Sequence, residues 1–191
     1  RKVAAAGSLG RALHIEGHYS NENSSNFFAS WRDKPDETPG AGMTGTGIHI
    51  LDAFTSIAGP AQSVTAQFMS SAGGHDPRDT ISALFEFKNG MSGTLAAVRP
   101  SPFYWRVHVF GDKGSAEALG ETETVVRCSG QPVEHKTYAP LDSLRAEFDA
   151  FAAAVEGVAP YPITPAEMTA TIAMFEAVIQ SLESGKPVDI A

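Results

Sequence analysis

Residues 81–98 read ISALFEFKNGMSGTLAAV, and this stretch decides the class of fold. Apolar side chains alternate with polar ones on both sides of the turn at 88–90, which is the pattern of two half-buried strands. The Asn-Gly pair inside the turn is a strong hairpin signal, because both residues tolerate the positive φ that a tight turn requires. The stretch therefore predicts an antiparallel hairpin.

The same alternation continues on either side of this hairpin. It predicts further strands at 11–20, near 64–68, and at 105–110, 115–119, 122–128 and 133–138. Short turns rich in glycine, proline and serine join the later runs, and neighbouring strands with such short connections pair antiparallel. The pattern therefore favours an antiparallel meander over a parallel, doubly wound sheet.

Helical spacing appears in three segments. Ile48, Leu51 and Phe54 share the apolar face of a helix that follows a glycine-rich turn. Two helices close the chain: the first carries an apolar stripe from Leu141 to Val155, and the second begins with the capping box at 164–167. We expect an α+β fold, with a large, predominantly antiparallel open sheet and helices packed on one face, forming a single domain over residues 1–191.

Composition excludes several classes of function. The chain has 191 residues, a formal net charge of −8 and 42% hydrophobic residues. This acidic balance, without a dense cluster of Lys and Arg, argues against a nucleic-acid partner. No apolar run reaches the roughly 20 residues of a membrane span, so we expect no membrane partner and a cytoplasmic location. The single Cys128 cannot form an internal disulfide.

The glycine-rich turn carries the main catalytic candidate. Residues 40–52 read GAGMTGTGIHILD, which places His49 in the first turns of the helix. Unpaired N–H groups at a helix N-terminus favour a neutral imidazole, which can accept a proton. Asp52 lies three residues further on, where it either fixes the tautomer of His49 or is a solvated surface carboxylate.

Four more residues are candidates for substrate binding. Trp31 and Arg32 precede the turn, where an indole packs on a sugar face and a guanidinium binds hydroxyls or a carboxylate. The alternative for both is a structural anchor of the loop. Thr44 and Thr46 offer hydroxyls beside His49 that orient a substrate or a water but do not act as general bases at neutral pH.

Two sets of strand residues have more than one interpretation. His14, Glu16 and His18 lie on one face of the first strand and are metal-ligand types, but a site needs a further ligand from another strand, so we predict no metal and a polar sheet face. A second set lines either an interface or the mouth of a pocket: Arg99, Tyr104, Trp105, Arg106 and His108.

Taken together, these segments resemble the C-terminal domain of the glucose-fructose oxidoreductase, inositol dehydrogenase and rhizopine catabolism (Gfo/Idh/MocA) family. The order and spacing of the motifs carry the resemblance over nearly the whole chain. They are GSLG at 7–10, WR at 31–32, the turn and helix at 42–52, FKNGM at 87–91 with Gly93, VFGDKG at 109–114, EFDAF at 147–151, PIT at 162–164 and SLESGKPV at 181–188.

The resemblance implies a two-domain, NAD- or NADP-dependent oxidoreductase that acts on a secondary hydroxyl of a sugar, inositol or related polyol. An N-terminal Rossmann domain would bind the coenzyme, and the sequence here, which has no Gly-x-Gly-x-x-Gly turn, would be the substrate domain, inactive alone. His49 matches the family histidine. Gly45 stands where the family has an aspartate, and the Lys34 tripeptide at 33–35 lies in the wrong place to be the family's catalytic lysine.

Two further expectations concern an alternative function for the chain and its assembly into oligomers. Because Gly45 replaces the family aspartate, a noncatalytic module for small-molecule binding or oligomerisation is the alternative function. Leu84 and Phe85 place apolar side chains on both faces of one strand. This indicates that the open face of the sheet is covered in a homodimer or tetramer.

Overall fold

The computed structural model describes residues 1–22, 34–70, 73, 76 and 79–190. Its helices are α1 (Lys2–Ala5), a π-helical turn (Met43–Gly47), α2 (Ile48–Ala58), α3 (Ser143–Val155) and α4 (Pro165–Ser184). Its strands are β1 (Ala12–Ser20), β2 (Ala61–Met69), β3 (Thr80–Phe87), β4 (Ser92–Val98), β5 (Tyr104–Gly111), β6 (Gly114–Leu119), β7 (Glu123–Cys128), β8 (Glu134–Thr137) and β9 (Val188–Asp189).

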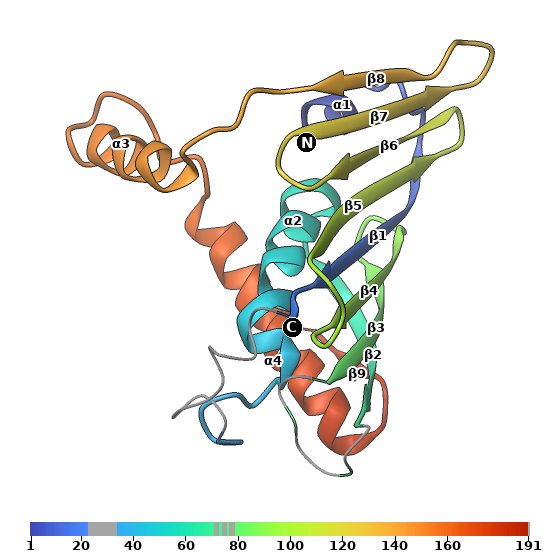
Figure 1. The fold of residues 1–191 in the computed structure, drawn as a ribbon, viewed down its shortest axis with the longest axis vertical. Coiled ribbons are helices and arrows are strands. Elements are labelled where there is room, and N and C mark those ends of the chain that lie inside the picture. Colours follow the sequence, from blue (N-terminus) through green and yellow to red (C-terminus); the bar gives the residue numbers. More distant parts are fainter. Residues whose placement is uncertain (23–33, 71–72, 74–75, 77–78, 191) are drawn as a thin grey trace.

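The strands form one open, curved sheet in the order β8-β7-β6-β5-β1-β4-β3-β2-β9 (Figure 1). Two antiparallel meanders, β2–β4 and β5–β8, flank β1. Strand β1 pairs antiparallel with β5 and parallel with β4. The predicted α+β fold with a large, predominantly antiparallel open sheet is therefore confirmed, and the hairpin at 88–90 joins β3 to β4 as the sequence indicates.

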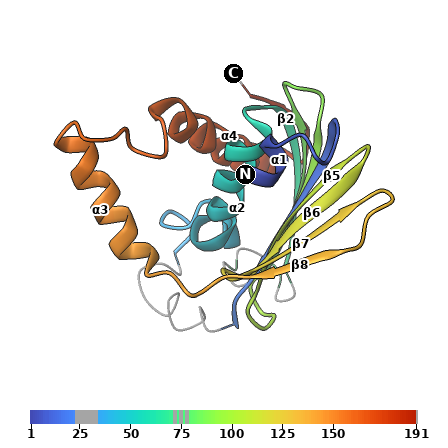
Figure 2. The same cartoon turned by 90° about the horizontal axis from the view of Figure 1, so that it is seen from above.

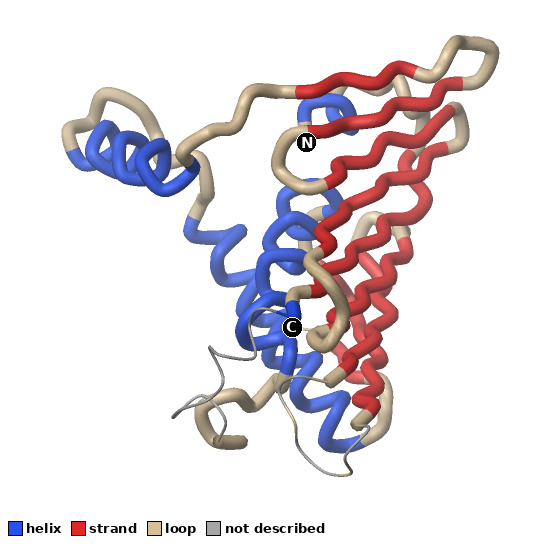
Figure 3. The backbone as a smooth tube through the Cα atoms, in the orientation of Figure 1, coloured by secondary structure: helices blue, strands red, loops and turns tan. Residues whose placement is uncertain are grey.

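Helices α2 and α4 cover one face of the sheet (Figure 3). The centre of this layer is an aromatic cluster in which the ring centroid of Phe54 lies 5.8 Å from that of Phe85 and 6.0 Å from that of Phe87. All three side chains are buried, as are Ile50 and Leu51 of α2. Burial of such side chains supplies most of the favourable free energy of folding.

Polar contacts attach α4 to this layer. The predicted capping box is present, with the Thr164 hydroxyl accepting the Glu167 N–H and the Glu167 carboxylate accepting the Thr164 N–H. In the middle of the helix, the hydroxyl of Thr171 donates to that of Thr55 on α2 at 3.0 Å. Near its end, Ser181 accepts the backbone N–H of Ala66 from β2 at 2.9 Å. Helix α4 is thus fixed to both α2 and the sheet.

Helix α3 departs from the sequence-based expectation. We expected both closing helices to pack on the sheet, but α3 stands apart from it (Figure 2). None of its residues is buried, and Leu144, Phe148 and Phe151 are 62%, 64% and 59% exposed. The expectation was wrong for this helix, because an apolar stripe shows that a face is suited to burial without showing what covers it.

Within the part of the chain that the structure describes, no helix is long and apolar enough to cross a lipid bilayer.

Candidate functional site

The glycine-rich turn forms a π-helical turn that continues without a break into α2. The N–H of Ile48 donates to the carbonyls of Met43 and Thr46, which closes the wide turn. Met43 is fully buried, and a Cβ atom on Gly47 would collide with its Sδ. His49 is the second residue of α2. Because the π-helical turn precedes α2 without a break, His49 lies more than one turn inside a continuous helical segment. The N–H groups of Met43 and Thr44 donate to the carbonyls of Gly40 and Ala41, so the helical segment begins before His49 and His49 does not lie at its N-terminus.

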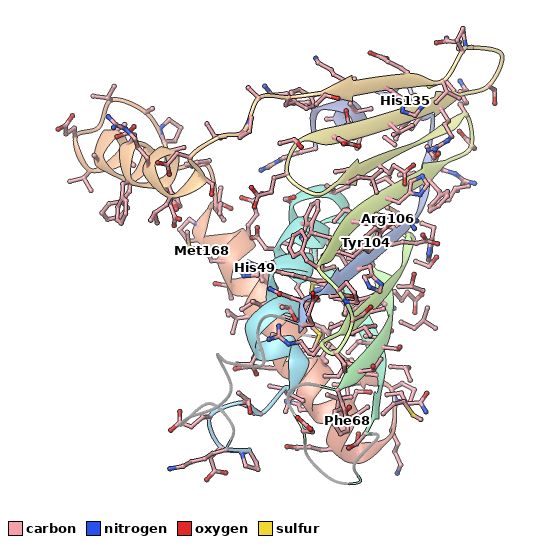
Figure 4. The ribbon with its side chains drawn as sticks, in the orientation of Figure 1. His49, Phe68, Tyr104, Arg106, His135 and Met168 are labelled. Atoms are coloured by element: carbon pink, nitrogen blue, oxygen red, sulfur yellow. The ribbon has the colours of Figure 1, made fainter. Side chains whose placement is uncertain are left out.

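His49 is exposed and opens into a cleft of about 560 Å³. The cleft lies between the start of α2, the adjoining ends of β1, β5, β6 and β7, and the start of α3. In Figure 4, His49 lies on α2 between Met168, at the beginning of α4, and Tyr104, on β5. The residues that line the cleft with His49 are Tyr19, Phe103, Trp105, Ala118, Gly120, Glu121, Glu123, Thr124, Tyr138 and Ser143.

Aromatic rings dominate the walls of this cleft. The ring centroid of Tyr19 lies 6.2 Å from that of His49 and 6.1 Å from that of Phe103, which it meets edge to face. Tyr19 pairs directly with Trp105 across β1 and β5, so both side chains lie on the helix-covered face. Clefts with aromatic walls and a few polar groups are typical of small-molecule sites.

Asp52 lies one turn after His49 and is half-buried. Burial raises the pKa of its carboxyl, and the negative charge of Glu167 adds to this, whereas the charges of His49 and Arg1 oppose it. Glu167 in turn pairs with Arg1 at 2.9 Å. Asp52 is thus an electrostatic neighbour of His49, but it lies outside the lining of the cleft.

The structure places the other candidates differently. The Thr46 hydroxyl is buried and donates to the Gly42 carbonyl at 2.7 Å, so it is committed inside the turn. Thr44 is half-buried and accepts the N–H of Gly40 at 3.3 Å. Trp31 and Arg32 lie outside the described residues. Of the predicted site residues that the structure describes, His49 alone lines the cleft.

The structure also separates the residues whose location the sequence left open. Trp105 faces the cleft, whereas Tyr104 packs edge to face on His18, with ring centroids 5.3 Å apart, on the opposite, open face of the sheet. Arg106 and His108 lie on that open face too, since each pairs with a residue of β1 that faces away from the helices. Arg99 is buried, with 2% of its surface exposed, and its desolvation lowers the pKa of the guanidinium to about 10.

An ion-pair network crosses the open face from β1 to β7. Arg106 pairs with Glu16 and lies 3.6 Å from Glu117, and Arg127 pairs with Glu117 at 2.6 Å. Burial alone raises the pKa of Glu117, but the hydrogen bond from Arg127 and the nearby positive charges outweigh it and lower that pKa. Burial lowers the pKa of His108, although Glu117 opposes this.

The three residues of metal-ligand type on β1 are occupied by protein partners. The ring of His14 contacts the hydroxyls of Ser92 and Thr94, and His18 contacts that of Ser20 at 2.5 Å. Over the described residues, no group of three His, Cys, Asp or Glu side chains has the arrangement of a metal site.

The sequence placed Trp105 at an interface or the mouth of a pocket, but it did not identify Tyr19 and Phe103 as walls of the cleft. The missing step was the pairing of β1 with β5, which brings together residues more than 80 positions apart. Periodicity within one strand carries no information on its neighbours in the sheet.

Comparisons with known proteins agree with this architecture. The family model described as the GFO/IDH/MocA C-terminal domain matches residues 1–117. The uncharacterized oxidoreductase C115.03 of Schizosaccharomyces pombe is 35% identical over 68 residues, which are 35% of this chain and 18% of that protein.

Two groups of solved structures share the fold. Levoglucosan dehydrogenase in complex with NADH and levoglucosan superposes with a TM-score of 0.79 at 20% identity, covering 99% of this chain and 61% of that one. The WlbA dehydrogenase of Bordetella pertussis, in complex with NADH and UDP-GlcNAcA, gives 0.77 at 18% identity, covering 100% and 59%. This chain therefore spans about three fifths of the length of these relatives.

The sheet, its helices and the family match over most of the chain lead to one assignment: the chain belongs to the Gfo/Idh/MocA oxidoreductase family and has the fold of that family's C-terminal domain.

Proposed function

We propose that this chain is the substrate domain of an NAD(P)-dependent oxidoreductase that acts on a secondary hydroxyl of a sugar, inositol or related polyol. The observation that carries the proposal is the position of His49, which opens into an aromatic-walled cleft of about 560 Å³. Related structures contain NADH together with levoglucosan or L-sorbose, which supports a sugar-like substrate.

The residues that the structure describes lack the features of a coenzyme cradle. A Rossmann site needs parallel strands with a glycine turn that presents free N–H groups to a pyrophosphate. Here β1 and β4 are the one parallel pair among the described strands, and after the glycine turn the N–H groups of Met43 and Thr44 donate to the carbonyls of Gly40 and Ala41. We therefore assign NAD or NADP to a separate nucleotide-binding domain.

Within such an enzyme, the coenzyme would supply hydride transfer, and this chain would handle the proton. During oxidation, the substrate carbon loses a hydride while its hydroxyl loses a proton, and the carbonyl product forms. We propose that His49 accepts that proton on an imidazole nitrogen, and that the negative charge of an ionised Asp52 stabilises the charged ring.

The test is turnover by a protein that joins this chain to a nucleotide-binding domain. We expect His49→Asn to lower kcat by about 10²–10⁴-fold, the usual contribution of a general base, and to leave KM nearly unchanged. His135→Asn, on the exposed strand β8, is the matched control and leaves turnover unchanged.

Equal kcat for His49→Asn and the wild-type protein would contradict a catalytic His49. Polyol binding without any turnover would instead favour the noncatalytic module, for which Gly45 in place of the family aspartate is the supporting observation.

We also propose that the open face of the sheet is an interface with a second copy of this chain, forming a homodimer or tetramer. This face carries a groove of about 600 Å³ and the exposed apolar side chain of Leu84, which is 55% exposed. We propose neither a nucleic acid nor a membrane as a partner. The cytoplasmic location stays a prediction.

A further inference from the structure

The open face of the sheet carries two histidines next to one arginine. Arg106 of β5 pairs directly with His18 of β1, and His108 lies two residues further along β5 on the same face. We infer that this group is an acid-sensitive switch, in which protonation of His18 and His108 beside Arg106 separates two copies of this chain. The inference rests on the interface proposed above and adds the control of its assembly by pH.

His108 is neutral in the structure. A guanidinium only donates hydrogen bonds, so the Nδ1 atom of His108, 3.0 Å from the Arg106 guanidinium, accepts one and carries no proton. His108 is 8% exposed, and its other ring nitrogen, Nε2, has no hydrogen-bond partner among the described residues. A proton on Nδ1 would place two positively charged donors against each other where little water reaches them.

His18 is half-buried in the groove of about 600 Å³ that it lines together with Arg106 and Leu84. Its ring meets that of Tyr104 edge to face, and its Nε2 atom lies 2.5 Å from the Ser20 hydroxyl. Burial lowers the pKa of His18, and the positive charge of Arg106 lowers it further. His18 is therefore neutral near neutral pH and gains its charge in acid.

The charged groups around these histidines balance at neutral pH. Arg106 and Arg127 carry positive charges, and Glu16 of β1 and Glu117 of β6 carry negative ones. Burial lowers the pKa of His108, and the two arginines act in the same direction, whereas Glu117 and Glu16 oppose them. Because the four charges are already paired with one another, protonation of both histidines leaves the face with an excess of positive charge.

An interface between two copies amplifies this change. In a symmetric interface the same patch of both copies is in contact, so each charge gained by one copy is gained by the other. The interface also takes the imidazoles further from water, which favours their neutral form. Separated chains therefore bind protons more tightly than the assembly does, and acid favours separation. Since an unperturbed imidazole titrates near pH 6.5 and both pKa values are lowered, the assembly is stable above about pH 6.5 and is lost below it.

The experiment is sedimentation of a protein that joins this chain to a nucleotide-binding domain, at about pH 7.5 and about pH 5. We expect an assembly at the higher pH and a dissociation constant at least about tenfold larger at the lower one, reversed on return to the higher pH. Circular dichroism follows the fold. Unfolding of the chain together with loss of the assembly would overturn the inference, because acid would then act on the fold and not on the interface.

Variants assign the effect to the two histidines. Glutamine is polar but does not titrate, so we expect His18→Gln and His108→Gln each to reduce the pH dependence and the double variant to abolish it. His14→Gln is the matched control on the same face of β1, because the ring of His14 contacts the hydroxyls of Ser92 and Thr94. An unchanged pH dependence in the double variant, or an equal loss in His14→Gln, would contradict the assignment.

A second measurement needs no variant and so does not depend on how well a substituted sheet folds. Linkage requires that dissociation of the wild-type assembly near pH 6 takes up protons, which calorimetry in two buffers of different ionisation enthalpy detects. Dissociation without proton uptake would overturn the inference.

The outcomes distinguish failure of this inference from failure of the proposed interface. If the wild-type protein is equally assembled at both pH values, the switch is wrong while the interface stands. If it is monomeric at both, the interface and the switch are both wrong.

Discussion

A single glycine on β1 determines how closely α2 approaches the sheet and thereby where His49 lies. A Cβ atom on Gly17 would collide with the Ile50 methyl and would lie 2.9 Å from the Phe54 ring. Both neighbours are fully buried and belong to the helix that carries His49. The position of the catalytic candidate thus depends on a residue that does no chemistry.

Replacement of this glycine is expected to destabilise the fold. Gly17→Ala overpacks the contact between β1 and α2 and lowers the free energy of unfolding by about 1–3 kcal/mol in denaturant titrations. Ser82→Ala, at an exposed position on β3, changes it by less than about 0.5 kcal/mol. Equal stability of Gly17→Ala and the wild-type chain would show that α2 is not held at this contact.

Site prediction from the sequence relied on local signals, and the catalytic role of His49 stays a prediction. His49 stood out because a glycine-rich turn, a helix and a histidine follow one another within a few residues. Thr46 has the same local setting, yet its hydroxyl turns inward to the Gly42 carbonyl. Periodicity predicts which face of a helix a residue lies on. It does not predict whether a hydroxyl on that face donates to the backbone of its own helix or points outward to a ligand.

At the scale of whole elements, α2 and α3 both carry an apolar stripe, but only the stripe of α2 is buried. Phe148 on α3 is 64% exposed, whereas Phe54 on α2 is fully buried among other aromatic rings. The sequences of both helices have a helical apolar repeat, so the sequence alone gave no reason to treat them differently.

The two helices therefore respond differently to truncation. Phe54→Ala removes a packed core ring and is expected to cost about 3–5 kcal/mol of unfolding free energy. Phe148→Ala changes it by less than about 0.5 kcal/mol in this chain, because the ring has little contact to lose. Chemical denaturation of both variants checks this, and a large loss for Phe148→Ala would mean that α3 is packed in solution.

Strand positions followed from alternation, but the order of strands did not. The hairpin between β3 and β4 was predictable because its turn lies within the sequence signal. The insertion of β1 between β4 and β5, and the pairing of the short β9 with β2, depend on contacts between distant segments. Such contacts leave no periodic trace within either partner strand.

At the scale of the whole molecule, two surfaces remain uncovered. The first, on the side of the helices, consists of the aromatic cleft and the exposed stripe of α3. The second is the open face of the sheet, which carries the ion-pair network and Leu84. The chain spans about three fifths of the length of these relatives, and we propose a nucleotide-binding domain as the partner of the first surface and another copy of this chain as the partner of the second.

The proposed interface between copies has a direct test. Leu84→Glu introduces a charge on the open face, where the wild-type residue is exposed, so the fold of one chain is retained. Burying an unpaired charge in an interface is strongly unfavourable, and we expect sedimentation to find a dimer or tetramer for the wild-type chain and a monomer for the variant. A monomeric wild-type chain, or an unchanged assembly in the variant, would exclude this interface.

The central claim is that His49 handles the substrate proton in the aromatic cleft. It is tested most directly by a structure of a protein that joins this chain to a nucleotide-binding domain, with NAD(P) and a cyclic polyol bound. The account predicts a polyol hydroxyl about 2.6–3.2 Å from a His49 nitrogen, with its carbon about 3–3.5 Å from the nicotinamide. A polyol bound elsewhere, or a nicotinamide out of reach of the cleft, would contradict it.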